Sequence, residues 1–104
     1  MTTDTLQKML DIQAEFQKKY KYQPTIHELA SAIMTEGGEL WSLTGKWWKK
    51  TAPPNLAKEQ LEESIDIFHF LMTVWLSLGL TADDVFNAYT LKMGVNIKRQ
   101  ETGY

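Results

Sequence analysis

Two capping boxes fix where helices begin in this chain, and they constrain its fold more than any other feature. Thr25 stands three residues before Glu28, and Thr81 stands three residues before Asp84. In each box the hydroxyl and the acid can satisfy backbone N–H groups that would otherwise lack a partner at the helix start. The sequence therefore predicts helices that begin just after Thr25 and just after Thr81.

Apolar periodicity and helix-breaking residues extend this pattern to four helices. The predicted helices run from about Thr5 to Lys19, from after Thr25 to about Leu43, from after Asn55 to about Leu78, and from after Thr81 to about Arg99. Pro24, Pro53-Pro54 and Gly79 fall in the breaks. Since no strand pattern is present, we predict an all-α, four-helix bundle-like fold in a single domain over residues 1–104.

Composition and charge exclude several classes of function. The net charge is -2 without a long basic run, which argues against a nucleic-acid-binding protein. Because the chain has no cysteine, it has no disulfide, thiolate zinc site or cysteine nucleophile. The apolar stretch from Ile65 to Leu80 is interrupted by polar residues, and the first ten residues lack a signal-peptide pattern. We therefore expect a cytoplasmic protein that binds neither nucleic acid nor a membrane.

Two pairs of acids indicate a metal site. Glu36 and Glu39 are three residues apart on the second predicted helix, and Glu63 and Asp66 repeat this spacing on the third. Residues three apart lie on the same face of a helix, and helices joined by one loop can pack antiparallel. Carboxylates that converge among apolar residues need a counter-charge, and oxygen ligands favour Mg²⁺.

Other interpretations of these acids were weighed. Acids at this spacing are more often a solvated helix face, but here two pairs fall on adjacent helices and Asp66 is flanked by apolar residues. A di-iron bundle would need a second carboxylate-x-x-His motif beside Asp66 and His69, and His27 has Pro24 at the required position. Gly37 and Gly38 disfavour a helix, so we expect a kink, a close backbone approach or tight helix packing there.

Aromatic and cationic residues lie between the two acidic pairs and on the last predicted helix. The loop between the second and third helices holds Lys46, Trp47 and Trp48, which can stack on a base and meet phosphates, although a tryptophan can equally cover the core or an interface. The last helix carries a stripe of donors, namely Tyr89, Lys92, Asn96 and Arg99. Such a stripe opposite an acidic metal site would suit a triphosphate, while a solvated face would explain each cation singly.

Together these motifs resemble a known family. One motif resembles the all-α NTP pyrophosphatases, a group that includes MazG-like proteins and dimeric dUTPases. It consists of Glu36-x-x-Glu39, Lys46 with the tryptophans, and Glu63-x-x-Asp66-x-x-His69-Phe70. The ending that is similar to the dimeric dUTPase branch is Lys92-x-x-x-Asn96-x-x-Arg99-Gln100-x-x-Gly103-Tyr104. Met9-Leu10 followed by Gln13 is similar to the same branch.

The resemblance implies roles for individual residues. Mg²⁺ would be held by Glu36, Glu39, Glu63 and Asp66, and Glu36 or Glu39 would orient or deprotonate the attacking water. The phosphates would be contacted by Lys46, Lys92, Asn96, Arg99 and Tyr104, and the base and sugar by Gln13, Phe70, Trp47 and Trp48. The implied reaction is hydrolysis of dUTP, or a related deoxynucleotide, to the monophosphate and pyrophosphate.

The substrate and assembly stay open at this point. Ser42 and Leu43 stand where the branch has an Asn-Glu pair, so a broad MazG-like enzyme, a dCTP-preferring enzyme and a non-catalytic nucleotide-binding module are alternatives. A short helical unit would complete its pocket and cover its apolar faces by association. We therefore expect a homodimer or homotetramer.

Overall fold

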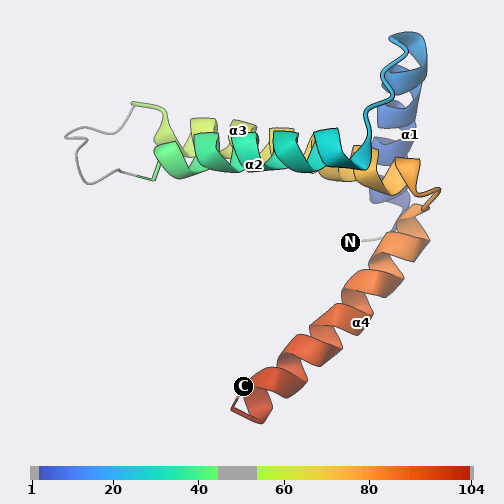
Figure 1. Ribbon diagram of the computed structural model, residues 1–104. Helices are drawn as coiled ribbons and strands as arrows, with labels where there is room; N and C mark the ends of the chain where they lie inside the picture. The colour runs from blue at the N-terminus through green and yellow to red at the C-terminus, as the bar shows by residue number, and fades with distance from the viewer. Residues whose placement is uncertain (1–2, 45–53, 104) are drawn as a thin grey trace.

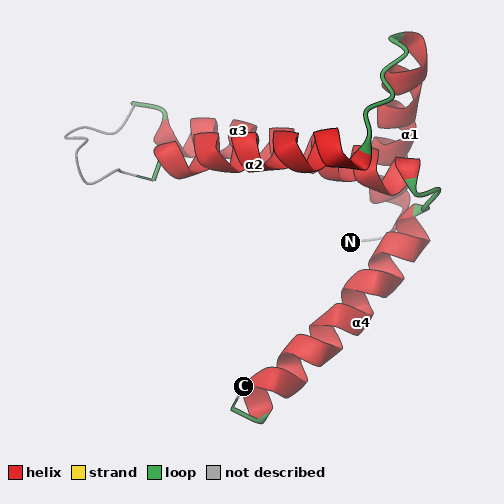
Figure 2. Ribbon diagram, in the orientation of Figure 1, coloured by secondary structure: helices red, strands yellow, loops and turns green. Residues whose placement is uncertain are grey.

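The computed structural model describes residues 3–44 and 54–103, which form four helices (Figures 1 and 2). The helices are α1 (Thr3–Lys19), α2 (Ile26–Ser42), α3 (Leu56–Ser77) and α4 (Ala82–Glu101). No strand occurs in these residues. The predicted all-α, four-helix bundle-like fold is confirmed, with helix ends within about two residues of those expected from the sequence.

Both capping boxes form as the sequence predicts. The Thr25 hydroxyl accepts a hydrogen bond from the Glu28 backbone N–H at 3.1 Å, and the Glu28 carboxylate accepts one from the Thr25 N–H at 2.9 Å. Thr81 and Asp84 make the same exchange at 3.3 and 2.9 Å. These bonds, chiefly those from the threonine N–H groups, lower the pKa of both carboxyls. Gly79, with φ of +73°, ends α3 in the left-handed conformation that glycine favours.

The helices form one antiparallel pair and one junction of three helices. Helices α2 and α3 lie side by side as an antiparallel pair, while α1 packs against the end of α3 and the start of α4 (Figure 1). The small core sits where α1, α3 and α4 meet, and its buried members are Leu6, Leu10, Met72 and Ala82. This junction fixes how α1 lies against α3, and it therefore positions the residues that face each other across those two helices.

Helix α4 leaves this junction and runs away from the α2–α3 pair (Figure 1). Its exposed apolar side chains are Phe86, Tyr89, Leu91, Met93, Val95 and Ile97. The radius of gyration is 16.7 Å, whereas a compact domain of this length has a value of about 13 Å. The chain taken singly is therefore extended, and beyond its first turn α4 carries apolar side chains that stay exposed.

Length and composition were also compared with those of membrane-spanning helices. No single helix among the described residues is long and apolar enough to cross a membrane. Helices α3 and α4 are long and apolar enough only when they are taken together, and they are bent by 108° at their connection.

Candidate metal and nucleotide site

Three carboxylates from α2 and α3 converge. Glu36, Glu63 and Asp66 each offer one oxygen, and these oxygens all lie within 4.8 Å of one another. The antiparallel pairing of the two helices brings Glu36 opposite Glu63, and the spacing of three residues places Asp66 on the same face as Glu63. The convergence expected from the sequence is thus present for three of the four acids.

Glu63 has the least favourable surroundings for a bare negative charge. Its Oε2 atom is buried, and no hydrogen-bond donor among the described residues reaches it. Two carboxyl groups can hydrogen-bond only when one of them carries a proton. Sharing a proton with Glu36 is the main cause that raises the pKa of Glu63, followed by burial and by the charges of Glu36, Asp66 and Glu39. Without a counter-ion the Glu63 carboxyl therefore holds its proton more tightly than a free glutamate does.

These residues fit a hard divalent cation. An orphaned carboxylate oxygen within reach of two others is the donor group that Mg²⁺ uses, since this ion takes oxygen ligands and keeps water for phosphates. Glu39 is exposed and lies outside the converging three, although its charge still acts on Glu63. Within the described residues no histidine joins the cluster, so nothing there supports a di-iron site.

The two glycines between Glu36 and Glu39 do not serve close packing within this chain. A Cβ atom added at Gly37 or Gly38 would meet no described atom within 4 Å. The expected close backbone approach or tight helix packing is therefore not found here. Both positions face open space within the described residues.

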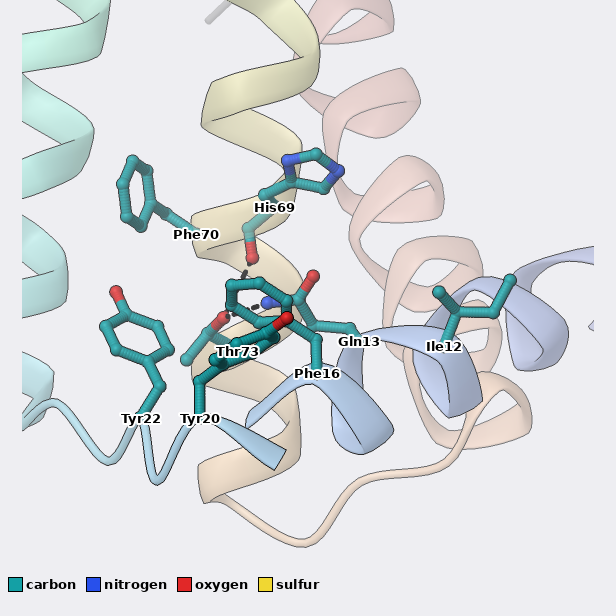
Figure 3. Close-up of a pocket in the computed structure, with 8 residues that line it drawn as sticks. All are labelled: Ile12, Gln13, Phe16, Tyr20, Tyr22, His69, Phe70 and Thr73. Carbon is teal, nitrogen blue, oxygen red and sulfur yellow. Dashed lines mark hydrogen bonds between the residues drawn. The ribbon is translucent and has the colours of Figure 1, made fainter. Parts of the chain in front are cut away.

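A pocket of about 520 Å³ opens between α1 and α3 (Figure 3). It is lined by Ile12, Gln13, Phe16, Tyr20, Tyr22, His69, Phe70 and Thr73. Aromatic rings form much of its wall: Phe16 lies 5.1 Å from Tyr20 and 6.4 Å from Tyr22, measured between ring centroids. A planar heterocycle can stack against such rings, and the volume is in the range of small-molecule sites.

A chain of hydrogen bonds joins the two walls of the pocket (Figure 3). The Gln13 side-chain amide on α1 donates to the Thr73 hydroxyl on α3 at 3.1 Å. The Thr73 hydroxyl donates in turn to the backbone carbonyl of His69 at 3.0 Å. Thr73 is 1% exposed, so this contact is shielded from water. Gln13 is therefore a polar group held in place within a mainly apolar pocket.

The carboxylates and the pocket share one face of α3. Asp66, His69, Phe70 and Thr73 follow the spacing i, i+3, i+4 and i+7, which keeps them on the same side of a helix. At a rise of 1.5 Å per residue, Phe70 lies about 6 Å and Thr73 about 10 Å along the axis from Asp66. The acids and the aromatic pocket therefore lie next to each other along this face of α3.

Sequence comparison agrees with this geometry. The sequence profile of a dUTPase family matches residues 3–79, which comprise α1, α2 and α3. The chain belongs to this family. The resemblance to the dUTPase branch of the all-α NTP pyrophosphatases is thereby confirmed. The motif at the end of the chain lies beyond the matched residues.

Curated relatives of this dUTPase-family chain are phage enzymes. It is 34% identical over 82 residues to a protein named dCTP pyrophosphatase from Enterobacteria phage T4. It is 37% identical over 82 residues to a protein of the same name from Enterobacteria phage LZ5. Each match covers 68% of this chain and 48% of the relative, so the chain spans about half the length of these relatives. No solved structure matches it significantly.

The remaining predicted site residues of this family member fall into three groups. Gln13 and Phe70 line the pocket together. Lys92, Asn96 and Arg99 share α4, which packs mainly on α1, so a single chain does not bring them to the carboxylates. Lys46, Trp47, Trp48 and Tyr104 lie outside the described residues. Phosphate contacts from α4 therefore stay a prediction that requires another copy of the chain.

Sequence reasoning missed the aromatic wall of the pocket. Phe16 lies on the first helix, and Tyr20 and Tyr22 lie in the break that follows it, so sequence patterns assigned none of them a role in the site. The structure turns the chain at Lys21, whose φ of +54° is uncommon for a residue other than glycine. The two tyrosines on either side of Lys21 thereby both reach Phe16. The Tyr-Lys-Tyr segment at the end of an amphipathic helix was the available signal.

Proposed function

We propose that this chain is a Mg²⁺-dependent pyrophosphatase that hydrolyses a pyrimidine deoxynucleoside triphosphate to the monophosphate and pyrophosphate. The observation that carries the proposal is the shared face of α3, on which Glu63 and Asp66 lead directly to Phe70 and Thr73. Acids that fit a cation and a pocket that fits a base are thus spaced about as far apart as the two ends of a nucleotide. Family membership supports the same chemistry.

The acids of the site would have different roles in hydrolysis. Glu36, Glu63 and Asp66 would hold the cation, and the deprotonation of Glu63 would accompany its binding. A bound Mg²⁺ supplies charge neutralisation at the phosphates and a lower pKa for an attacking water. Glu39 lies beside these three acids but outside their cluster, which leaves its carboxylate available to orient that water toward the α-phosphate.

Two bases are in competition as the natural substrate. The family description favours dUTP, while the names of the two phage relatives favour dCTP. Both are pyrimidines, and the pocket between Gln13 and the tyrosines offers stacking surfaces together with one oriented amide. We therefore place deoxypyrimidine triphosphates ahead of purine nucleotides.

Association with a second copy is part of the proposal. In the single extended chain, the apolar side chains of α4 are exposed, and its stripe of Lys92, Asn96 and Arg99 lies on a helix that runs away from the carboxylates (Figure 1). A homodimer or homotetramer would cover the apolar residues and could bring the cations of one chain to the acids of another.

The test is hydrolysis of dUTP, dCTP, dTTP, dATP, dGTP and UTP with Mg²⁺, with release of pyrophosphate and of single phosphate measured separately. We expect pyrophosphate release led by dUTP or dCTP and abolished by a chelator. Pyrophosphate from purine and pyrimidine nucleotides alike would indicate a broad MazG-like enzyme. No turnover in folded protein would contradict an enzyme and favour a nucleotide-binding module.

A further inference from the structure

We infer that Thr73 is a positioning residue that fixes the orientation of the Gln13 amide and thereby sets which pyrimidine the pocket prefers. The inference rests on the proposed function, because it assumes that a base occupies the pocket between α1 and α3. It assigns to Thr73, a buried residue of the pocket lining, a role that acts through Gln13.

The direction of the hydrogen bonds determines the orientation of the amide. A hydroxyl group has a single proton. Thr73 donates this proton to the His69 carbonyl at 3.0 Å, so toward Gln13 its oxygen can only accept. Gln13 must therefore present its NH₂ group to Thr73. Because the nitrogen and the oxygen of an amide have nearly the same shape, the hydrogen-bond partners determine which atom faces Thr73. The Gln13 carbonyl oxygen is left to face a ligand.

Burial makes this orientation persistent. Thr73 is 1% exposed, so water cannot replace its hydroxyl as the partner of Gln13. Turning the amide over would place its carbonyl oxygen against the Thr73 hydroxyl, which would then have to give up its bond to the buried His69 carbonyl to donate to Gln13. In Figure 3 the amide nitrogen points to Thr73 and the oxygen points away from it.

A fixed amide discriminates between the two candidate bases. At positions 4 and 3, uracil presents a carbonyl acceptor and an N–H donor, whereas cytosine presents an amino donor and a ring-nitrogen acceptor. The two patterns are opposite, so for a base held in one position, an amide that pairs through its carbonyl oxygen and its second N–H matches only one of them. An amide free to turn over would match both. Thr73 thus controls the choice of base through Gln13.

The experiment compares binding of dUMP and dCMP to the full chain by calorimetry, without metal, for wild type and three variants. Thr73→Val keeps the shape but removes the hydroxyl, and Thr73→Ser keeps the hydroxyl. Thr90→Val is the matched control, because Thr90 makes the same kind of bond to the Phe86 carbonyl, at 2.9 Å on α4 and away from the pocket. We expect wild type to prefer one nucleotide by about tenfold or more, from one matched hydrogen bond.

The preference should fall to about threefold or less in Thr73→Val and persist in Thr73→Ser and Thr90→Val. An unchanged preference in folded Thr73→Val, or no preference in wild type, would overturn the inference. If Thr73→Val does not fold, protection of the Gln13 side-chain amide protons from solvent exchange in wild type decides the matter, and rapid exchange overturns it. Turnover of triphosphates is measured separately, so a protein that discriminates but does not hydrolyse would contradict only the proposed enzyme.

Discussion

The α2–α3 pair and α4 both carry charged residues at helical spacing, but they differ in what the chain provides around them. On α2 and α3, Glu36, Glu63 and Asp66 converge, and a buried carboxylate oxygen has no donor among the described residues. On α4, Lys92 and Arg99 lie on a helix that runs away from this cluster (Figure 1). The first group forms a site within one chain, whereas the second does not.

The match to the dUTPase family ends between α3 and α4, at the boundary between these two regions. It covers residues 3–79, which include both walls of the pocket and every carboxylate of the cluster, and α4 begins after it at Ala82. The difference teaches that charge alone does not identify a site. The acids are informative because they converge and because the surroundings of Glu63 are unfavourable for a negative charge, while the cations of α4 become informative only when something covers that helix.

Asp66→Asn should have the largest effect, because it removes a ligand from the part of the site that one chain completes. We expect the rate of Mg²⁺-dependent pyrophosphate release to fall at least about a thousandfold, equivalent to roughly 4 kcal/mol of transition-state stabilisation. Helix content measured by circular dichroism should not change. Glu62→Gln is the control, since Glu62 lies on the same helix and makes only an exposed ion pair of 4.0 Å with Lys58. Normal turnover by Asp66→Asn would remove Asp66 from the metal site.

Leu91→Glu tests whether another copy of the chain covers α4. Leu91 is 75% exposed in the single chain, so a charge there should not disturb an isolated molecule. If α4 is covered by another copy, the buried charge should dissociate the assembly and lower activity about a hundredfold, equivalent to about 3 kcal/mol. Sedimentation velocity measures the mass, and Gln100→Glu adds a charge at an exposed polar position of the same helix as the control. An unchanged mass would show that this face of α4 is not the interface.

The sequence allowed prediction of features that depend on local spacing. The capping boxes at Thr25 and Thr81, the stop at Gly79 and the pairing of Glu63 with Asp66 follow from which residues stand three or four positions apart. Helical periodicity carries such information directly. It also placed Lys92 and Arg99 on one stripe, which the structure retains within α4.

Features that depend on how helices are placed relative to one another could not be read from the sequence. The direction of α4 depends on the 108° bend after α3, and no apolar pattern specifies whether the same chain or another covers a helix. The aromatic pocket depends on how α1 lies against α3 and on the left-handed conformation of Lys21. The relay from Gln13 to Thr73 joins residues 60 positions apart, a distance over which local patterns carry no information.

Arg99→Ala sharpens the comparison by asking whether α4 contributes to substrate binding at all. If Arg99 of one chain meets the outer phosphates held by another, its loss should weaken triphosphate binding by roughly tenfold or more. Monophosphate binding should change little, because the monophosphate lacks the outer phosphates. The measurement is the affinity of Asp66→Asn protein for a triphosphate and for the monophosphate, with and without the arginine change. Equal losses for both ligands would contradict a role at the outer phosphates.

The capping acids and Glu63 should respond to pH in opposite directions. The pKa values of Glu28 and Asp84 are lowered by folding, so the stability they contribute is present above their unfolded pKa values and is lost as pH falls. The pKa of Glu63 is raised above its ordinary value of 4.5. Its contribution is therefore fully present below that value and is lost as pH rises through the higher folded pKa.

Glu63→Gln tests this contrast with the smallest expected effect, a change in Tm. In the presence of a chelator, the variant should melt above wild type at neutral pH, because glutamine avoids the repulsion from Glu36 and Asp66. The difference should shrink as pH falls below about 4.5, where the carboxyl is protonated in both folded and unfolded states. Added Mg²⁺ should reverse the order, since only wild type keeps all three acidic ligands. The control Glu62→Gln should show neither the higher Tm without metal nor the reversal with Mg²⁺. A wild type that melts above Glu63→Gln without metal would contradict the repulsion among these acids.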